Sequence, residues 1–183
     1  MTKSHYALAG PHSDPPADWM YWVAEGQLLA GPYPGSSDPR EHRSKIQTLV
    51  AARIATVINL MQGPELLRFA PYQPVFGELA AEQVGFLQFP IRDVSVPSQD
   101  LMLSILDAID ESMHQGRAVY VHCWGGVGRT GTVVGCWMLR HGLATPDDVL
   151  TKLARLRNQD KMRGNRESPE TEEQRMFVQE WAS

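Results

Sequence analysis

The segment VYVHCWGGVGRTGTVVG, residues 119–135, constrains the fold more than any other part of the chain. A short apolar run ends at His122-Cys123, three glycines follow within five residues, and small and apolar residues resume after Arg129-Thr130. This pattern predicts a buried strand, a tight loop, and a helix that begins near Arg129. A strand that passes directly into a helix in this way is typical of a sheet covered by helices.

The rest of the chain shows the same alternation of strand and helix patterns. Strands are predicted within residues 26–35 and at 54–60, 86–91 and 117–123, and helices at 39–53, 74–85, 98–115 and 129–142 and after Thr145 and Ser168. Residues 61–72 show no regular pattern. We therefore predict an α/β fold with a central, mostly parallel sheet flanked by helices. Ligands of such sheets bind beyond the carboxyl ends of the strands, where Cys123 and Asp93 both fall.

The composition is that of one globular domain. The chain has 183 residues, of which 43% are hydrophobic, and we predict a single domain at 19–183 behind a loosely ordered N-terminal arm at 1–18. A formal charge of −4 gives no general attraction to nucleic acid or acidic membranes, although basic residues gather at 152–166. No apolar run is long enough to span a bilayer, and two cysteines make no disulfide framework. We expect a monomer in a reducing cytoplasm, with the thiols free.

The loop between the strand and the helix has the chemistry of an anion-binding site. The residues that would form it are Trp124, Gly125, Gly126, Val127 and Gly128. The three glycines allow the backbone N–H groups to turn inward, and the helix N-terminus adds partial positive charge. Arg129 supplies a planar fork that matches two oxygens of a phosphate. The same donors stabilise a thiolate, so the sequence predicts that Cys123 is a nucleophile beneath a bound phosphoryl group.

This motif resembles the signature of the cysteine-dependent phosphatases, which comprise the protein tyrosine and dual-specificity phosphatases. The matching residues are His122, Cys123, Gly126, Gly128, Arg129, Thr130 and Gly131. The resemblance covers residues 20–182, and the size fits the compact dual-specificity branch. It implies the fold of that family, attack of Cys123 on phosphorus, and binding of the phosphoryl oxygens by Arg129. It also implies that the Thr130 hydroxyl supports the thiolate as leaving group and that His122 orients the loop.

Other interpretations of the two cysteines stay open. Cys123 could be a buried core cysteine at the end of a strand, or the sulfur-carrying residue of a rhodanese-like protein, although the Gly-Arg-Thr-Gly ending favours the phosphatase. Cys136 lies within an apolar helical pattern, which favours ordinary packing over a redox partnership with Cys123.

A general acid is needed because hydrolysis of a phosphomonoester expels an alkoxide or phenoxide. Asp93 lies in the loop after a predicted strand, thirty residues before Cys123, and the family resemblance implies an acid at such a place. Asp100 is the alternative, but it falls in the first turn of a predicted helix, where carboxylates are common. Asp107 and Asp110 fall on one face of the same helix.

The C-terminal stretch SPETEEQ resembles the segment with which tyrosine phosphatases position the hydrolytic water through two glutamines. Here Gln174 matches the second, and Glu170 stands at the first. An ordinary helix N-terminus is the favoured interpretation of Glu170, and for Gln174 both interpretations stay open. The resemblance also raises the possibility that Arg155 or Arg157 supports the phosphate loop, although arginines at such positions usually face solvent.

The substrate is inferred from the loop itself. It carries no lysine or histidine between Cys123 and Arg129, which argues against highly charged substrates and for a monophosphate ester. We expect a phosphorylated protein, with phosphotyrosine favoured, and no metal or other cofactor, because the thiolate and Arg129 do the work that metals do elsewhere. A small phosphorylated metabolite such as a nucleotide, sugar or inositol phosphate is the alternative substrate. A phosphopeptide-binding module without activity is a further alternative.

Overall fold

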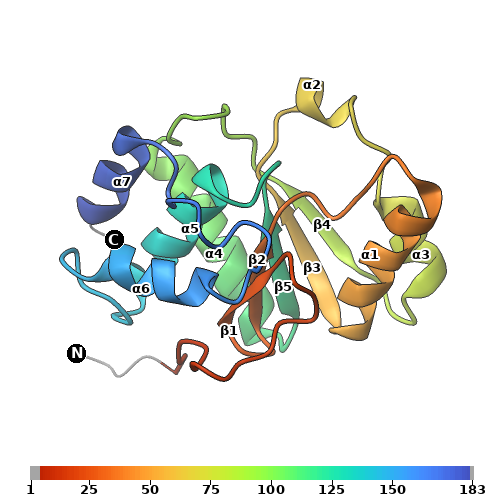
Figure 1. Cartoon of the computed structure of the whole chain (residues 1–183), viewed down its shortest axis with the longest axis horizontal. Helices are drawn as coiled ribbons and strands as arrows, with labels where there is room; N and C mark the ends of the chain where they lie inside the picture. Colours follow the sequence, from red (N-terminus) through yellow and green to blue (C-terminus); the bar gives the residue numbers. More distant parts are fainter. Residues whose placement is uncertain (1–4, 182–183) are drawn as a thin grey trace.

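Residues 5–181, the part of the chain that the computed structural model describes, form a five-stranded mixed sheet with helices on both faces (Figure 1). The strand order is β1-β2-β5-β3-β4. The strands are β1 (Tyr21–Ala24), β2 (Leu28–Gly31), β3 (Ile54–Asn59), β4 (Gly85–Gln88) and β5 (Ala118–His122). The β1–β2 pair is antiparallel, and the β2–β5, β5–β3 and β3–β4 pairs are parallel. The predicted α/β fold with a mostly parallel sheet is confirmed.

Strand β1 is not predicted from the sequence. Its four residues, YWVA, are too few for an alternating pattern to be visible. A tight turn with Gly26 at a φ of +69° returns the chain into β2, and only glycine adopts this conformation without strain. The pairing of β1 with β2 therefore depends on a hairpin turn that the sequence pattern does not reveal.

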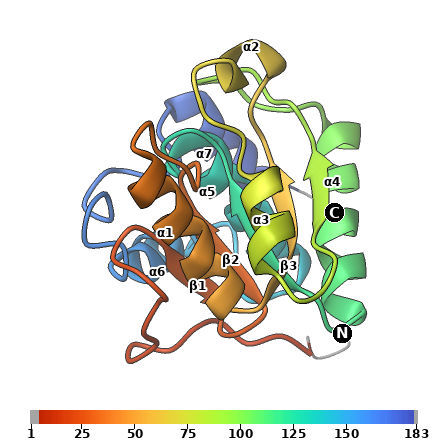
Figure 2. The same ribbon diagram turned by 90° about the vertical axis from the view of Figure 1, so that its right-hand side faces the viewer.

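The helices form two layers. Helices α1 (Pro39–Ala51) and α3 (Gln73–Leu79) cover one face of the sheet, and the other face is covered by α4 (Gln99–His114), α5 (Gly128–Arg140), α6 (Val149–Arg157) and α7 (Glu172–Gln179) (Figures 1 and 2). The short α2 (Gly63–Leu66) lies beyond the carboxyl end of β3. Among residues 5–181 no helix has the length and apolar character to cross a membrane.

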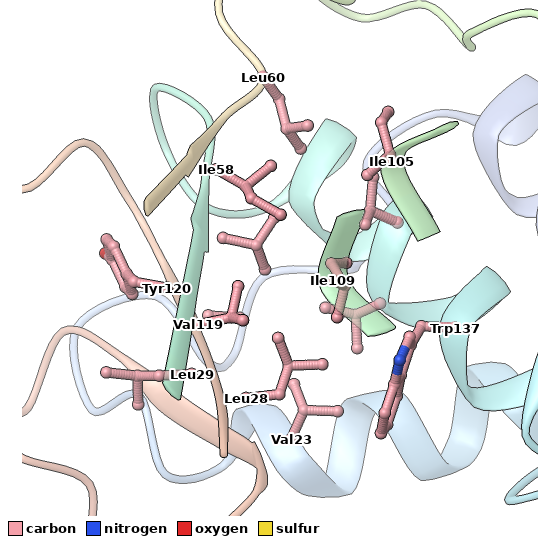
Figure 3. Packing of buried hydrophobic residues seen from close by; sticks show 14 of the residues in the cluster. Val23, Leu28, Leu29, Ile58, Leu60, Ile105, Ile109, Val119, Tyr120 and Trp137 are labelled. Atoms are coloured by element: carbon pink, nitrogen blue, oxygen red, sulfur yellow. The ribbon is translucent and has the colours of Figure 1, made fainter. Parts of the chain in front are cut away.

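Both faces of the central strands are buried. Figure 3 shows Leu28 and Val119 turned toward Ile109 of α4 and Trp137 of α5, whereas Tyr120 turns to the opposite side of the sheet. All five side chains are fully buried. Burial on both faces explains why these strands are continuous apolar runs rather than alternating patterns. It also fixes β5 at the centre of the sheet, so the loop that follows it leaves from a rigid base.

Three helix boundaries and one loop differ from the predictions. Helix α3 ends at Leu79 rather than at residue 85, α6 begins at Val149 rather than at Thr145, α7 begins at Glu172 rather than at Ser168, and residues 61–72 include α2. Ser168 does not cap α7, because its hydroxyl donates to the carbonyl of Val127 at 2.7 Å. The Thr171 hydroxyl caps α7 instead and accepts the N–H of Gln174. Before α6, the Asp148 carboxylate accepts the N–H of Thr145 at 2.8 Å and closes a separate turn.

The predicted N-terminal arm lies against the domain where the structure describes it. Residues 5–18 contain no helix or strand. The Tyr6 ring nevertheless packs on Trp137 at 5.3 Å between centroids, and the N–H of Ala9 donates to the carbonyl of Val23. Residues 1–4 of the arm and the last two residues of the predicted domain lie outside the described part.

Candidate active site

The site lies at the carboxyl edge of the parallel strands. Strand β5 ends at His122, Cys123 follows, and α5 begins at Gly128. A cavity of about 180 Å³ opens over this loop and is lined by Asp93, Cys123, Trp124, Gly125, Val127, Gly128, Arg129, Arg166 and Glu170. The structure therefore brings together the cysteine, the arginine and the aspartate that the sequence analysis selected. Of the five predicted loop residues, Gly126 does not line this cavity.

Gly126 instead holds the loop against the neighbouring strand. Its φ is +68°, and a Cβ at this position would lie 2.4 Å from the carbonyl carbon of Gly31. Its own carbonyl accepts a hydrogen bond at 2.8 Å from Arg157, which is fully buried and also donates to the carbonyl of Arg163. Arg157 is thus the arginine that supports the loop. Arg155, the other arginine considered for this role, is exposed.

His122 is a fully buried neutral side chain. Burial lowers its pKa from 6.5 to about 4, and the nearby Arg129 charge acts in the same direction. Nδ1 lies 3.1 Å from the carbonyl oxygen of Cys123, and because a carbonyl only accepts, Nδ1 carries the proton. Nε2 then accepts from the Tyr72 hydroxyl at 3.0 Å. His122 is therefore fixed from two sides and orients the backbone at Cys123.

Cys123 lines the cavity, and the residue is 3% exposed. Both cysteines are free thiols. Cys136 is fully buried within α5, and burial raises its pKa, which agrees with the packing role favoured above. The hydroxyl of Thr130, next to Arg129 in the chain, is buried and has no hydrogen-bond partner among residues 5–181. Because buried hydroxyls normally form a hydrogen bond, the Thr130 hydroxyl is expected to have a hydrogen-bond partner.

Arg129 is held by an acidic residue that the sequence analysis missed. The two carboxylate oxygens of Glu65 accept from Nη1 and Nη2 at 2.8 Å each, which is a bidentate pair. Burial by itself would raise the pKa of Glu65, but the hydrogen bonds from Arg129 hold that pKa below its usual value. Burial would lower the pKa of Arg129, and Glu65 raises it. Glu65 is on α2, inside the stretch without a regular pattern, so no periodic signal marks it.

The five N–H donors of Arg129 can be counted one by one. Nη1 donates to Glu65 and to the carbonyl of Ile91 at 3.1 Å. Nη2 donates to Glu65 and lies 2.9 Å from a carboxylate oxygen of Asp93. The remaining donor, Nε, is buried and has no partner within the described residues. The free donor of this guanidinium is therefore Nε, and Asp93 lies at Nη2.

Of the aspartates considered as the general acid, Asp93 lines the cavity, and its side chain is 58% exposed. Asp100 is in the first turn of α4, as expected for a residue that interacts with the helix dipole. Asp107 forms an ion pair with Arg140, and Asp110 accepts from the indole of Trp137 at 2.9 Å. Asp107 and Asp110 thus face α5 rather than the loop, and Asp100 is exposed and does not line the cavity. The geometry thus favours Asp93 among the candidate acids.

The C-terminal segment contacts both the phosphate loop and the Asp93 loop. Gln174 is fully buried, and its Nε2 donates to the carbonyl of Ser95 at 3.0 Å. Its Oε1 accepts the N–H groups of Glu170 and Thr171 at 3.1 and 3.2 Å. Gln174 therefore holds the two segments together, and Glu170, which the sequence left as an ordinary helix start, lines the cavity. The exposed Trp124 also lines the cavity and is not part of the core.

A nucleophile-bearing loop closed by an arginine, at the end of a central parallel strand, is the arrangement of a cysteine-dependent phosphatase. Comparison with known proteins gives the same class. A family model described as "Swiss Army Knife protein, DSP-PTPase phosphatase domain" matches residues 18–178. The chain belongs to this family of dual-specificity phosphatase domains, which decides against the rhodanese-like alternative.

Individual relatives match parts of the chain. An uncharacterized protein of Methanocaldococcus jannaschii is 35% identical over 99 residues, which are 54% of this chain and 60% of that protein. The tyrosine-protein phosphatase cdc-14 of Caenorhabditis elegans is 42% identical over 48 residues, which are 26% of this chain and 6% of that protein. The chain thus spans less than two thirds of the length of these curated relatives.

Solved structures show the same fold. The crystal structure of Tk-PTP in its active form has a TM-score of 0.65 at 24% identity and covers 84% of this chain and 90% of that chain. A kinase associated phosphatase with its catalytic cysteine substituted has a TM-score of 0.68 at 17% identity, covering 82% of this chain and 83% of that chain. At these identities the likeness concerns the fold.

Proposed function

We propose that this phosphatase hydrolyses phosphomonoesters on proteins, phosphotyrosine foremost, through a phosphocysteine intermediate on Cys123. The observation that carries the proposal is that Arg129, whose buried Nε has no partner among residues 5–181, lines the same cavity as the buried Cys123. A phosphoryl group in the cavity accepts from Nε, from the inward N–H groups of the loop, and from Nη2 once Asp93 moves away. These donors lie around the phosphoryl oxygens, where negative charge must be stabilised in the transition state.

In the first step the Cys123 thiolate attacks phosphorus. The sulfur–phosphorus bond forms as the ester oxygen–phosphorus bond breaks, and the leaving oxygen takes a proton from Asp93. In the second step water attacks the phosphocysteine, its proton passes to the Asp93 carboxylate, and the sulfur–phosphorus bond breaks. The partnerless hydroxyl of Thr130 is the group we assign to stabilise the departing thiolate. A free thiol nucleophile needs reducing conditions, so we assign the protein to the cytoplasm.

The test is to trap the intermediate. Asp93→Asn removes the group that we assign to take the proton of the hydrolytic water, so an acid quench during turnover of an aryl phosphate should give a phosphoryl adduct on the peptide that contains Cys123. Cys123→Ser should show no adduct and no turnover, yet still bind tungstate, because the loop and Arg129 remain. Cys136→Ala is the matched control, and it should keep turnover. An adduct on another residue, or turnover by Cys123→Ser, would contradict the mechanism.

A further inference from the structure

The catalytic cavity is too small to hold more than the phosphoryl end of a substrate. Its volume is about 180 Å³, whereas sites that enclose a whole small molecule measure roughly 300–1,000 Å³. The remainder of the substrate must therefore lie outside, on the rim of the cavity. The side chains of that rim decide which phosphomonoesters bind.

One side of the rim carries an arginine with free donors. The guanidinium carbon of Arg68 lies over the ring of Trp124, 5.5 Å from its centroid, and the rings of Trp124 and Phe69 pack in a T-shaped pair with centroids 5.3 Å apart. The Arg68 side chain is exposed and forms no hydrogen bond or ion pair within residues 5–181, although its charge contributes to the lowered pKa of Glu65. A guanidinium that stacks on an aromatic ring keeps its N–H groups available at its edge. Arg68 is thus a positively charged side chain that is held on Trp124, a residue that lines the cavity, and whose N–H donors have no hydrogen-bond partner within residues 5–181.

The second rim arginine comes from the segment before α7. Arg166 lines the cavity and forms an ion pair with Glu170 at 2.9 Å. Their side chains are 53% and 38% exposed, so this pair contributes little stability. A Glu170 oxygen lies 3.2 Å from where a Cβ on Gly128 would be, directly over the phosphate loop. A bound phosphate dianion repels this carboxylate, which leaves Arg166 free to interact with an anionic group of the substrate.

Arg68 and Arg166 change the inference about substrate charge that rests on the loop alone. The loop has no lysine or histidine, but Arg68 and Arg166 bring positive charge to the rim from two segments far apart in the chain. Exposed apolar side chains adjoin these residues in the chain: Leu67, next to Arg68, is 88% exposed, and Val94, next to Asp93, is 55% exposed. An open rim with charged and apolar groups fits an extended peptide better than a compact polyphosphate, which would need its cations clustered inside the cavity.

We propose, on the basis of the phosphatase function above, that this site selects phosphopeptides with acidic side chains flanking the phosphorylated residue, and that Arg68 and Arg166 bind those side chains. Each exposed arginine–carboxylate contact is worth about a two- to five-fold change in kcat/KM. Arg68 contributes through its preorganised position on Trp124. Arg166 contributes after exchange of Glu170 for the substrate carboxylate.

The experiment compares two phosphotyrosine peptides that differ only in having glutamate or glutamine at the flanking positions. The wild-type protein should prefer the glutamate peptide, and raising the salt concentration should reduce the preference because exposed charges are screened. Arg68→Gln and Arg166→Gln should each lower the glutamate-to-glutamine ratio of kcat/KM by about two- to five-fold. Arg43→Gln removes an equally exposed positive charge on α1, where Arg43 pairs with Glu78, and should keep the wild-type ratio.

The other outcomes separate the two proposals. A ratio of one in the wild-type protein, with good turnover of both peptides, would overturn the role of the rim arginines and leave the phosphatase function in place. Turnover of 4-nitrophenyl phosphate without turnover of either peptide would overturn the protein substrate itself. A clear preference for an inositol polyphosphate over both peptides would show that the two arginines serve a small polyanion instead.

Discussion

Glu65 offers the sharpest test of how the site is held, because it is bound to Arg129 through both carboxylate oxygens. Replacement by glutamine keeps the shape of the side chain and removes its charge. Arg129 is 1% exposed and Glu65 is 15% exposed, so the pair lies between the buried and exposed cases. Breaking a fully buried pair costs about 3–5 kcal/mol, and an exposed pair is worth about 0–1 kcal/mol. Since Asp93 still contacts the guanidinium, we expect Glu65→Gln to lower the free energy of unfolding by about 2 kcal/mol.

The effect on catalysis should be larger than the effect on stability suggests. Without Glu65 the guanidinium is free to tilt, and Nε is no longer directed at the phosphoryl position. A misplacement of about 1 Å costs on the order of 10²-fold in rate, so we expect that loss in kcat/KM for an aryl phosphate. Urea unfolding followed by tryptophan fluorescence gives the stability, and initial rates give the kinetics.

The matched control is Glu78→Gln, which removes a carboxylate from an ion pair with Arg43 whose side chains are 60% and 51% exposed. It should change the free energy of unfolding by less than about 0.5 kcal/mol and leave the kinetics as they are. The reasoning is refuted if Glu65→Gln cannot be distinguished from Glu78→Gln in both measurements.

Three other changes test the remaining groups. Arg129→Lys should lose at least about 10²-fold in kcat/KM although the charge is kept, because a lysine has no planar fork; near-normal steady-state rates would contradict this. Asp93→Asn should slow hydrolysis of phosphotyrosine peptides by roughly 10²–10⁴-fold, and less for phenyl phosphates with better leaving groups; an equal loss across a series of substituted phenyl phosphates would mean that Asp93 only shapes the loop. His122 has a folded-state pKa of about 4 against 6.5 unfolded, so the unfolded chain binds the proton first, and stability should fall by about 3 kcal/mol as pH drops from 6.5 to 4. His122→Asn should flatten that part of the pH dependence of urea unfolding, and an unchanged dependence would show that His122 is not the group involved.

The parts of the site that are contiguous in sequence could be predicted from it. The strand that ends at His122-Cys123, the glycine loop and Arg129 follow one another directly in the chain. Local backbone geometry therefore sets how they lie relative to one another. Asp93 could be found as well, since the carboxyl ends of parallel strands meet at one edge of the sheet. In each case a local pattern or a general rule of sheet topology carries the information.

The groups that hold these residues could not be found in this way. Glu65 and Tyr72 come from a stretch with no hydrophobic period, and each reaches the loop across a long separation in the chain. Glu170 and Arg68 look like ordinary charged surface residues until the fold brings them to the rim. A strand of four residues, β1, is likewise invisible until its hairpin partner is known. Such placements depend on tertiary packing, which single-sequence patterns do not encode.

The donors of Arg129 link substrate binding to the position of the general acid in our proposed mechanism. In the free protein, an Asp93 carboxylate oxygen lies 2.9 Å from Nη2. A phosphoryl group that binds to Nε and Nη2 takes the place of Asp93 at the guanidinium, so the Asp93 side chain must leave Arg129 as the substrate binds. Binding of the substrate thus releases Asp93 toward the leaving group, to which it donates a proton in the first step, while Glu65 keeps the guanidinium in position throughout.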